Sequence, residues 1–423
     1  MRRLLYLVLL LSVAPVARAT DHFVVCGNTN NGNGTNWQAA ASAGAAGAYN
    51  DLPATLLRGD TYFIASTNGT IKACHEHQFS DAPSGTTRIF VYAATASPTS
   101  YVATRVTSIA GWTSATMDVA VAGPVNIRLA TTGSNASFFF FNQPYYTIDG
   151  QIGSGLPAQN GLDHTKYGLY LNTVTGTQCS GPGGTATCIF FNISTHDIAI
   201  FHFATEGTHL TADPPAGAGE AEQLMKATVG TLGNTYLRYG YALNGYCIVQ
   251  IRSVPGNTDD MVVDHIIFKN RYESANFHGE DCSCSGGATD GVTRLWFTNN
   301  TSINTGSTAS GLATPTIGHP TPPTSQIGPV YIYGNTSACT TDADASLYCG
   351  TSSMNDFFDA LMVGSVYIFN NTYARHSPNT GASIAQRMGD NGFYSGASNA
   401  RLVNNLHAEE PTAFVAFFDP ASM

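Results

Sequence analysis

Charged residues are scarce in this sequence. Lys and Arg number 18 and Asp and Glu number 28, which together make 11% of 423 residues and leave a formal net charge of −10. A nucleic-acid-binding surface needs clustered cations, so this composition argues against a nucleic-acid partner. A weakly charged surface rich in hydroxyl groups instead suits a polysaccharide, or self-association into regular arrays.

Long apolar runs are also lacking beyond the N-terminus. No later stretch reaches the roughly 18 apolar residues that a transmembrane helix needs, which predicts a protein with no membrane span. The start, Met1-Arg2-Arg3 and a short leucine-rich run, is typical of a secretory signal peptide, and Ala17-Arg18-Ala19 offers small residues for cleavage. We therefore expect residues 1–19 to be removed and the mature protein to be secreted to the extracellular space.

Helical periodicity is missing as well. Gly, Asn, Thr and Ser separate short β-branched or aromatic runs, and apolar residues do not recur at intervals of 3.6. Five of these runs end in asparagine at intervals of 30 to 36 residues, at Asn270, Asn300, Asn335, Asn371 and Asn405. One residue type recurring at a nearly constant period predicts a solenoid in which these asparagines stack on successive circuits.

The repeat therefore predicts an all-β fold, a single-stranded parallel β-helix with three short sheets per circuit and protruding loops. We expect an N-terminal cap over residues 20–75, with a short helix over residues 39–48, and the β-helix over residues 76–423. An antiparallel sandwich or propeller, which also has many short strands, stays open as the alternative. The side chains expected in the interior are Ile266 or Ile267, Leu295, Val330, Val366 and Trp296.

The N-terminal segment is similar to a known group of proteins. The similarity rests on Trp37 and on the phrase Asn-Asp-Leu-Pro-Ala-Thr-Leu-Leu-Arg-Gly-Asp-Thr-Tyr at residues 50–62. These residues and the repeats resemble exported right-handed β-helix proteins of the pectate-lyase-like superfamily, which implies a right-handed coil. The resemblance implies no single activity, because the superfamily holds lyases, hydrolases, esterases and non-enzymatic adhesins.

Nine cysteines in an exported chain predict disulfides. Two expected pairs bracket short loops, and the third would join two parts of the cap. The expected pairs are Cys179 with Cys188, Cys339 with Cys349, and Cys26 with Cys74. The pairing of Cys247, Cys282 and Cys284 stays open.

Ionisable residues gather between residues 257 and 281. In a chain so poor in charge, this segment is the strongest indication of a functional site, although acidic residues on such loops are often merely solvated. The candidate catalytic residues are Asp259, Lys269, Arg271, Glu280 and Asp281, and the candidate substrate-binding residues are Asp260, Glu273, His278 and Arg294.

Hydrolysis of a polysaccharide is the first reaction that these residues fit. It needs two carboxyl groups, one protonated and one ionised, and Asp259, Glu280 and Asp281 offer them. Asn-Thr-Asp259 and Gly-Glu-Asp281-Cys282 are similar to motifs of polygalacturonase-like hydrolases. The Gly-His-Gly and Arg-Ile-Lys motifs of that family are absent from the sequence.

Elimination on a uronic-acid polymer is the second reaction. Lys269 and Arg271 lie two residues apart on an expected strand, so they point to one side and offer a base, and calcium is the cofactor that would neutralise the substrate carboxylate. A non-catalytic extracellular β-helix, such as an adhesin, a surface-layer protein or a fibre component, stays open as the third interpretation. A second run of potential metal ligands holds His196, Asp197, His202, Glu206 and His209.

Overall fold

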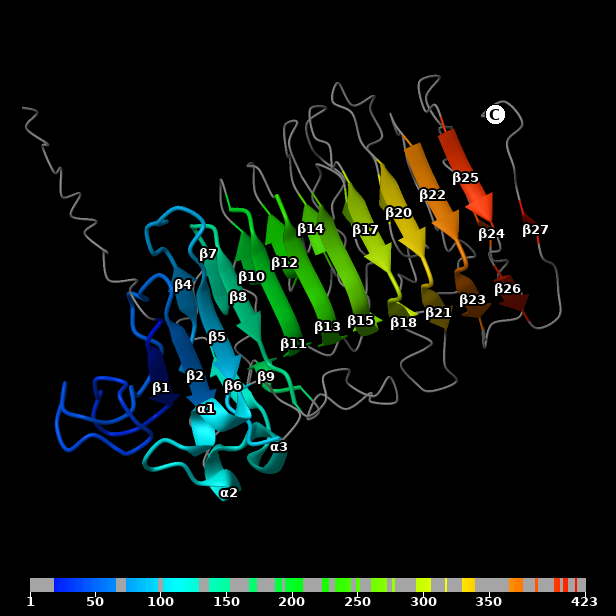
Figure 1. Ribbon diagram of the computed structural model, residues 1–423. Coiled ribbons are helices and arrows are strands. Elements are labelled where there is room, and N and C mark those ends of the chain that lie inside the picture. The colour runs from blue at the N-terminus through cyan, green and yellow to red at the C-terminus, as the bar shows by residue number, and fades with distance from the viewer. Residues whose placement is uncertain are drawn as a thin grey trace, which may run out of the picture.

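The structure is a computed structural model, and the part of the chain that it describes forms a parallel solenoid. Every strand pairing in this part is parallel, and Figure 1 shows the strands stacked side by side along one axis. The prediction of an all-β parallel solenoid is therefore confirmed. The described residues are 19–65, 74–97, 102–128, 137–152, 167–172, 187–191, 195–207, 223–227, 233–244, 249–251, 260–271, 276–277, 294–305, 316–317, 329–338, 365–375, 385–386, 399–403, 406–409 and 415–416.

The strands of the first face stack in chain order from β1 to β25. They are β1 (Asp21–Val25), β2 (Thr61–Ala65), β5 (Ile89–Ala93), β8 (Tyr146–Asp149), β11 (Ile198–Glu206), β13 (Thr235–Leu243), β15 (Met261–Arg271), β17 (Leu295–Thr298), β20 (Val330–Tyr333), β22 (Ser365–Phe369) and β25 (Asn399–Val403). Because β1 pairs with β2 and β2 pairs with β5, the sheet of the first face already begins within residues 20–75, the segment expected to form the cap.

The other strands form the second and third faces. The second face combines the C-terminal halves of β11, β13 and β15 with β3 (Cys74–His75), β6 (Val125–Arg128), β9 (Leu169–Asn172), β18 (Thr301–Thr305), β21 (Thr336–Ala338), β23 (Thr372–Arg375) and β26 (Leu406–Glu409). The third face holds β4 (His77–Phe79), β7 (Phe139–Phe141), β10 (Thr187–Phe191), β12 (Gln223–Ala227), β14 (Val249–Ile251), β16 (Asn276–Phe277) and β19 (Thr316–Ile317). A further pair is β24 (Ala385–Gln386) with β27 (Val415–Ala416).

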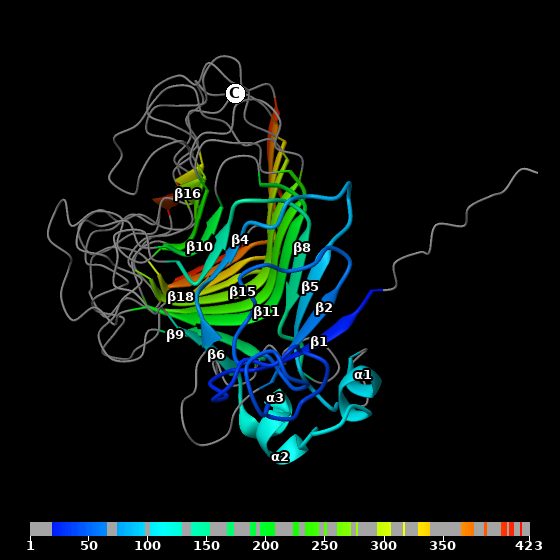
Figure 2. The same cartoon turned by 90° about the vertical axis from the view of Figure 1, so that its left-hand side faces the viewer.

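The first two faces are one continuous sheet that bends sharply. Strands β11, β13 and β15 run through both faces, and each bends at a residue with positive φ, at His202 (52°), Tyr239 (57°) and His265 (54°). Figure 2, which looks along the stack, shows the two faces meeting at this corner. On later circuits the strand is interrupted at the same place, so that β17 and β18 replace one long strand.

The interior is filled by alternate residues of each strand. Met261 and Val263 on β15 are fully buried and align with Leu295 and Phe297 on β17. The expected interior positions of Leu295 and Val330 are confirmed, because both side chains are fully buried. This alternation leaves the other side chains of the first face pointing outward, which positions the candidate site.

Buried asparagines join successive circuits just after the corner. Asn335 Nδ2 donates to Phe297 O at 2.9 Å, and Asn335 Oδ1 accepts from Asn300 N at 2.9 Å. Asn371 repeats both bonds one circuit further, with Ile332 O and Asn335 N at 3.0 Å. Because these bonds satisfy main-chain groups at the bend, they hold one circuit in register with the next.

The expectation that Asn270 belongs to this stack is wrong. Ile266 aligns with Asn300, whose Oδ1 accepts from Ile266 N at 2.9 Å. Asn270 instead stacks at the far end of the second face, where Asn304 Nδ2 donates to its Oδ1 at 3.3 Å. The reason is that β15 passes through both faces and has an apolar run in each half. The run in its second half, which ends at Asn270, looks in sequence like the first-face runs of later circuits. Asn405 lies outside the described residues.

The short helix expected over residues 39–48 is also wrong. This segment forms turns, with positive φ at Gly44 and Gly47, because glycine favours turns over helix. The described helices are α1 (Ala103–Thr107), α2 (Ser114–Met117) and α3 (Val119–Ala122). Trp37 packs against this region, and its Nε1 donates to Val106 O at 3.0 Å. None of the described helices has the length and hydropathy needed to cross a membrane.

One expected disulfide is confirmed. Cys26 and Cys74 are bonded, so β1 is joined to β3 on the second face. Cys188 lies in β10, but the structure does not describe its side chain. The remaining cysteines all lie outside the described residues: Cys179, Cys247, Cys282, Cys284, Cys339 and Cys349.

Replacing Asn335 by alanine should destabilise the protein. The change removes the bonds to Phe297 O and Asn300 N and leaves buried groups unpaired, which should cost roughly 2–4 kcal/mol of unfolding free energy. Urea denaturation followed by circular dichroism measures this loss as a lower midpoint. The control is Asn370→Gly at an exposed, positive-φ position, which should leave the midpoint unchanged. Equal midpoints for Asn335→Ala and the wild type would contradict a stabilising ladder.

Removing the disulfide should also lower stability. The bridge closes a chain segment with a sequence separation of 48 residues, so the chain-entropy estimate of its contribution is about 4 kcal/mol. The double change Cys26→Ala and Cys74→Ala should lower the urea midpoint accordingly. Peptide mapping without reductant should recover both cysteines in one linked fragment. Free thiols at both positions would show that the bond does not form.

Candidate functional site

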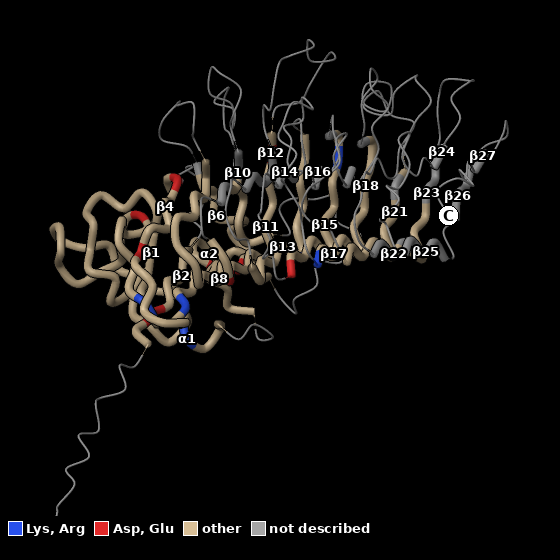
Figure 3. The backbone as a smooth tube through the Cα atoms, turned by 90° about the horizontal axis from the view of Figure 1, so that it is seen from above, with Lys and Arg blue, Asp and Glu red and all other residues tan. Residues whose placement is uncertain are grey.

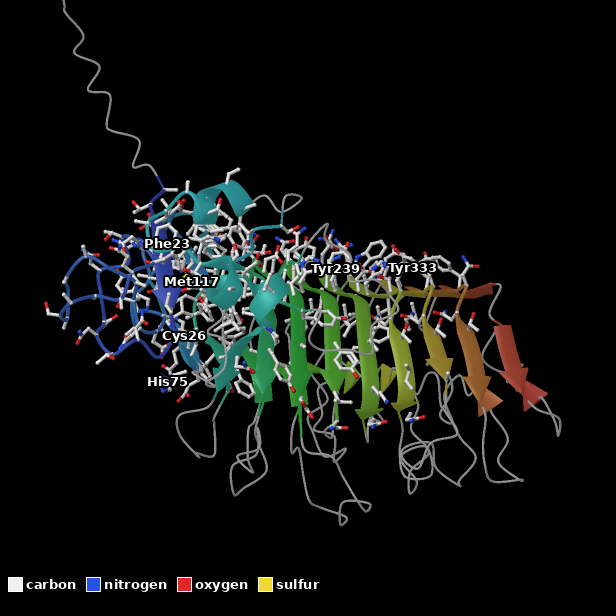
Figure 4. All side chains as sticks on the ribbon, turned by 90° about the horizontal axis from the view of Figure 1, so that it is seen from below. Phe23, Cys26, His75, Met117, Tyr239 and Tyr333 are labelled. Carbon is white, nitrogen blue, oxygen red and sulfur yellow. A yellow bond between two sulfur atoms is a disulfide. The ribbon has the colours of Figure 1, made fainter. Side chains whose placement is uncertain are left out.

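The outward side of the first face carries two columns of side chains along the solenoid. Because equivalent residues pair in register from strand to strand, each column holds one side chain per circuit. The first column holds Tyr236, Val262, Trp296, Tyr331 and Tyr367, and the second holds Arg238, Asp264, Thr298, Tyr333 and Phe369. Figure 4 shows Tyr239, at the adjoining corner, and Tyr333 projecting from the same side of the molecule.

Aromatic rings in these columns stack on one another. Trp296 and Tyr331 have ring centroids 4.0 Å apart, and Tyr331 and Tyr367 follow at 5.1 Å, with near-parallel planes in both pairs. We call Trp296, Tyr331 and Tyr367 the aromatic ladder. The expectation that Trp296 packs in the core is wrong, because it alternates with the buried Leu295 and Phe297 and therefore points outward.

A groove of about 330 Å³ opens at the end of the aromatic ladder. It lies over β13, β15 and β17, and it combines aromatic, ionisable and amide side chains. Its lining residues are Tyr236, Arg238, Asp260, Val262, Asp264, His265, Trp296, Thr298, Asn299 and Tyr333. Apolar walls with a few convergent polar groups are typical of a small-molecule or saccharide site.

Asp264 is the buried carboxylate at the floor of the groove. Its Oδ1 accepts from Thr298 Oγ1 at 2.7 Å and Asn299 Nδ2 at 3.0 Å, and its Oδ2 lies 2.7 Å from Arg238 Nη2. Burial, the largest influence, raises the pKa of Asp264, but the hydrogen bonds from its neighbours outweigh burial and lower that pKa below its ordinary value. Asp264 is therefore ionised and fully bonded, which suits holding other groups in place.

Asp260 is the accessible carboxylate at the rim. Its side chain is 33% exposed, and its Oδ1 lies 3.2 Å from Arg294 Nε. Trp296 Nε1 donates to the same oxygen at 3.4 Å. Of the two carboxylates, Asp260 is the one placed to meet a ligand.

Three aromatic residues occupy the strained corner beside the groove. On later circuits the corner residue is Asn299, Gly334 or Asn370, which tolerate positive φ, whereas earlier circuits place His202, Tyr239 and His265 there. The Tyr239 ring lies 5.0 Å from the ring of His202 and 5.3 Å from that of His265. Bulky residues with such backbone angles cost free energy and concentrate at functional sites.

Each of the two histidines has an aspartate at its Nδ1. His265 Nδ1 lies 2.9 Å from Asp264 Oδ2, and His202 Nδ1 lies 2.6 Å from Asp149 Oδ1. The His202 contact has hydrogen-bond geometry, so Asp149 orients that imidazole, whereas the His265 contact is a close approach of two groups without that geometry. His265 lines the groove, so its imidazole can meet a ligand there.

The structure brings together two of the residues proposed from sequence, Asp260 and Arg294. Lys269 lies beyond the bend of β15, on the outward side of the second face, and aligns there with Leu243 and Ile303. Arg271 ends β15, and its side chain is outside the description. Asp259, Glu273, His278, Glu280 and Asp281 lie outside the described residues.

The second run of potential metal ligands does not gather where it is described. His196 Nδ1 contacts Asp197 at 2.8 Å, His202 contacts Asp149, and Glu206 accepts from the Tyr170 hydroxyl. His209 is outside the described residues. Within the described part, the group of three potential ligands is Cys26, Asp51 and Cys74, and its two sulfur atoms are already bonded to each other.

Sequence reasoning missed His265, Asp264 and Tyr239. The sequence feature that could have indicated His265 is the residue type at the corner, because the next circuits have asparagine or glycine at the position of His265. That signal becomes readable only after the circuits are aligned correctly, and placing Asn270 with Asn300 shifted β15 by four residues.

Replacing Asp264 by asparagine should change the acid sensitivity of the fold. Its pKa is lowered in the folded protein, so the stability from its ionised form is fully present above the ordinary value of 3.8 and is lost as pH falls through the lower folded value. Asp264→Asn should be less stable at neutral pH and should lose less on acidification. Urea midpoints between pH 7 and about 2 measure this. Thr298→Val, which removes one bond, should give an intermediate acid response; identical acid responses in all three proteins would contradict the assignment.

The comparisons with known proteins show distant similarity. No protein-family model and no curated protein matches the chain. Two crystal structures of the GH136 lacto-N-biosidase from Eubacterium ramulus are similar in part, the native protein at 9% identity with a TM-score of 0.36, and the selenomethionine derivative at 10% with 0.35. Each alignment covers 92% of this chain, and 68% and 67% of those chains. Similarity at this level supports no shared activity or substrate.

Proposed function

We propose that the protein binds and hydrolyses a neutral polysaccharide in the groove over β13, β15 and β17. The observation that carries this proposal is the meeting of an aromatic wall, formed by Trp296, with the accessible carboxylate of Asp260 and the imidazole of His265. Aromatic faces suit the apolar faces of sugar rings, and the polar groups suit their hydroxyls.

The balance of charge in the groove favours a neutral substrate. Arg238 is paired with Asp264, and Arg294 with Asp260, so neither cation is in excess. Figure 3 shows how sparse charged residues are along the described strands. A uronic-acid polymer would need unpaired cations or a metal to neutralise its carboxylates. Lys269, the base considered for elimination, lies around the corner on the second face.

Asp260 and His265 are the groups that we assign to chemistry. Asp260 and Asp264 are four residues apart on one strand, which separates their Cα atoms by about 13 Å, and every oxygen of Asp264 is already bonded. These two carboxylates therefore do not form the hydrolytic pair by themselves. Asp259, Glu280 and Asp281 remain our candidates for the second carboxyl group.

The same proposal includes export of a right-handed β-helix protein. The disulfide between Cys26 and Cys74 supports an oxidising compartment, in agreement with the signal peptide expected at residues 1–19. The handedness follows from the strong preference of crossovers between parallel strands.

A non-catalytic glycan-binding protein is the second candidate. The aromatic ladder continues past the groove to Tyr367, away from Asp260 and His265. A binding surface longer than the ionisable cluster is what an adhesin or fibre protein would use.

Assays of the mature protein on neutral and uronic polysaccharides should show new reducing ends with neutral substrates and no unsaturated-uronate absorbance. Asp260→Asn should lower turnover by about 10²–10⁴-fold, because it removes a proton-transferring carboxylate with little change in volume, and binding should persist.

The matched control is Asp197→Asn. Asp197, just before β11, lies 3.2 Å from Arg88, much as Asp260 lies beside Arg294, but Asp197 does not line the groove. Its variant should retain turnover. Binding without turnover in the wild type would favour the non-catalytic candidate, and unsaturated products would replace hydrolysis by elimination.

A further inference from the structure

The first outward column is aromatic on both sides of one short side chain. Tyr236 on β13 aligns with Val262 on β15, and Val262 aligns with Trp296 on β17. The aromatic ladder then continues without interruption to Tyr331 and Tyr367. The position of Val262 is thus a gap in the column, and all three of Tyr236, Val262 and Trp296 line the groove.

The gap between Tyr236 and Trp296 is wider than a flat aromatic ring needs, and its width suits a puckered sugar ring. Adjacent strands lie about 4.7–4.9 Å apart, so positions two strands apart are separated by about 9.5 Å. Atoms in contact approach to about 3.5–4.0 Å, so a flat ring between two walls needs about 7–8 Å. A puckered sugar ring is thicker than a flat ring and fills the remaining space.

One wall of the gap has an aromatic face on which no ring of the described residues stacks. The Trp296 ring lies within 14° of parallel to Tyr331, which covers one of its faces, so its other face is turned along the solenoid axis toward Val262. The bond from Trp296 Nε1 to Asp260 holds the indole in this orientation. Arg238 and His265 line the same groove, where they can meet the hydroxyl groups of a sugar.

We propose that a single pyranose ring of the neutral polysaccharide enters the gap between Tyr236 and Trp296, above Val262, and packs against the open face of Trp296. The site rests on the proposed function and adds to it the position and size of one bound sugar unit. A ring held there lies beside Asp260, which places the adjoining glycosidic bond near the accessible carboxylate.

Filling the gap is the direct test. Val262→Tyr supplies the missing ring and should keep or raise the urea midpoint, because aromatic cross-strand pairs stabilise a sheet. Binding of cellohexaose, xylohexaose and mannohexaose to the full mature protein is measured by calorimetry, with oligogalacturonate as the anionic comparison. For the hexasaccharide that the wild type binds, Val262→Tyr should weaken affinity by at least about tenfold. Asp197→Asn, outside the groove, should bind within about twofold of wild type, and Val262→Thr, which leaves the gap open, should lose less affinity than Val262→Tyr.

A second pair of variants tests the wall without filling the gap. Trp296→Leu should weaken binding by about tenfold, and Tyr367→Leu, at the far end of the aromatic ladder, should weaken it less. Wild-type affinity in Val262→Tyr or in Trp296→Leu would overturn this site and leave the proposed function standing. Failure of the wild type to bind any of these sugars or polysaccharides would overturn both.

Discussion

Hydrogen bonds from buried asparagine side chains to the main chain of the neighbouring circuit hold the corner of this solenoid. At the corner the backbone turns too sharply for regular pairing, and Asn300, Asn335 and Asn371 bond the groups that would otherwise be unpaired. Since a shift of one residue would turn every side chain to the opposite face, these bonds also keep the outward columns aligned. The groove and the aromatic ladder both depend on that alignment.

The corner changes character where the groove lies. Circuits after β15 use Asn299, Gly334 and Asn370 at the positive-φ position, whereas β11, β13 and β15 use the bulkier His202, Tyr239 and His265. Each bulky residue in this conformation costs of order 1–3 kcal/mol. The protein therefore tolerates strain at His265, beside the groove, and avoids it on later circuits. This distribution agrees with a functional role for the corner residue beside the groove and a purely structural role for the corner residues of later circuits.

Ion pairs give this charge-poor surface its polarity without giving it a net charge. Arg88 contacts Asp197, Arg238 contacts Asp264, and Arg294 contacts Asp260, all along the outward side of the first face. Each pair presents donors and acceptors together. A surface of this kind can hydrogen-bond the hydroxyl groups of a sugar, while it gives a polyanion no excess of positive charge to bind.

The recurring asparagines and the cysteine positions were enough to predict a parallel solenoid and the bridge between Cys26 and Cys74, because the period of a repeat and the positions of cysteines are properties of the chain itself. The cluster of ionisable residues in a charge-poor sequence led to Asp260, and Arg294 was proposed with it. The roles of Asp264, His265 and Val262 were decided only in three dimensions. Strand β15 is eleven residues long and alternates on two faces, so its sequence is compatible with more than one register. The pairing of β15 with β13 and β17 selects one register, and that choice determines which side chains meet in the groove.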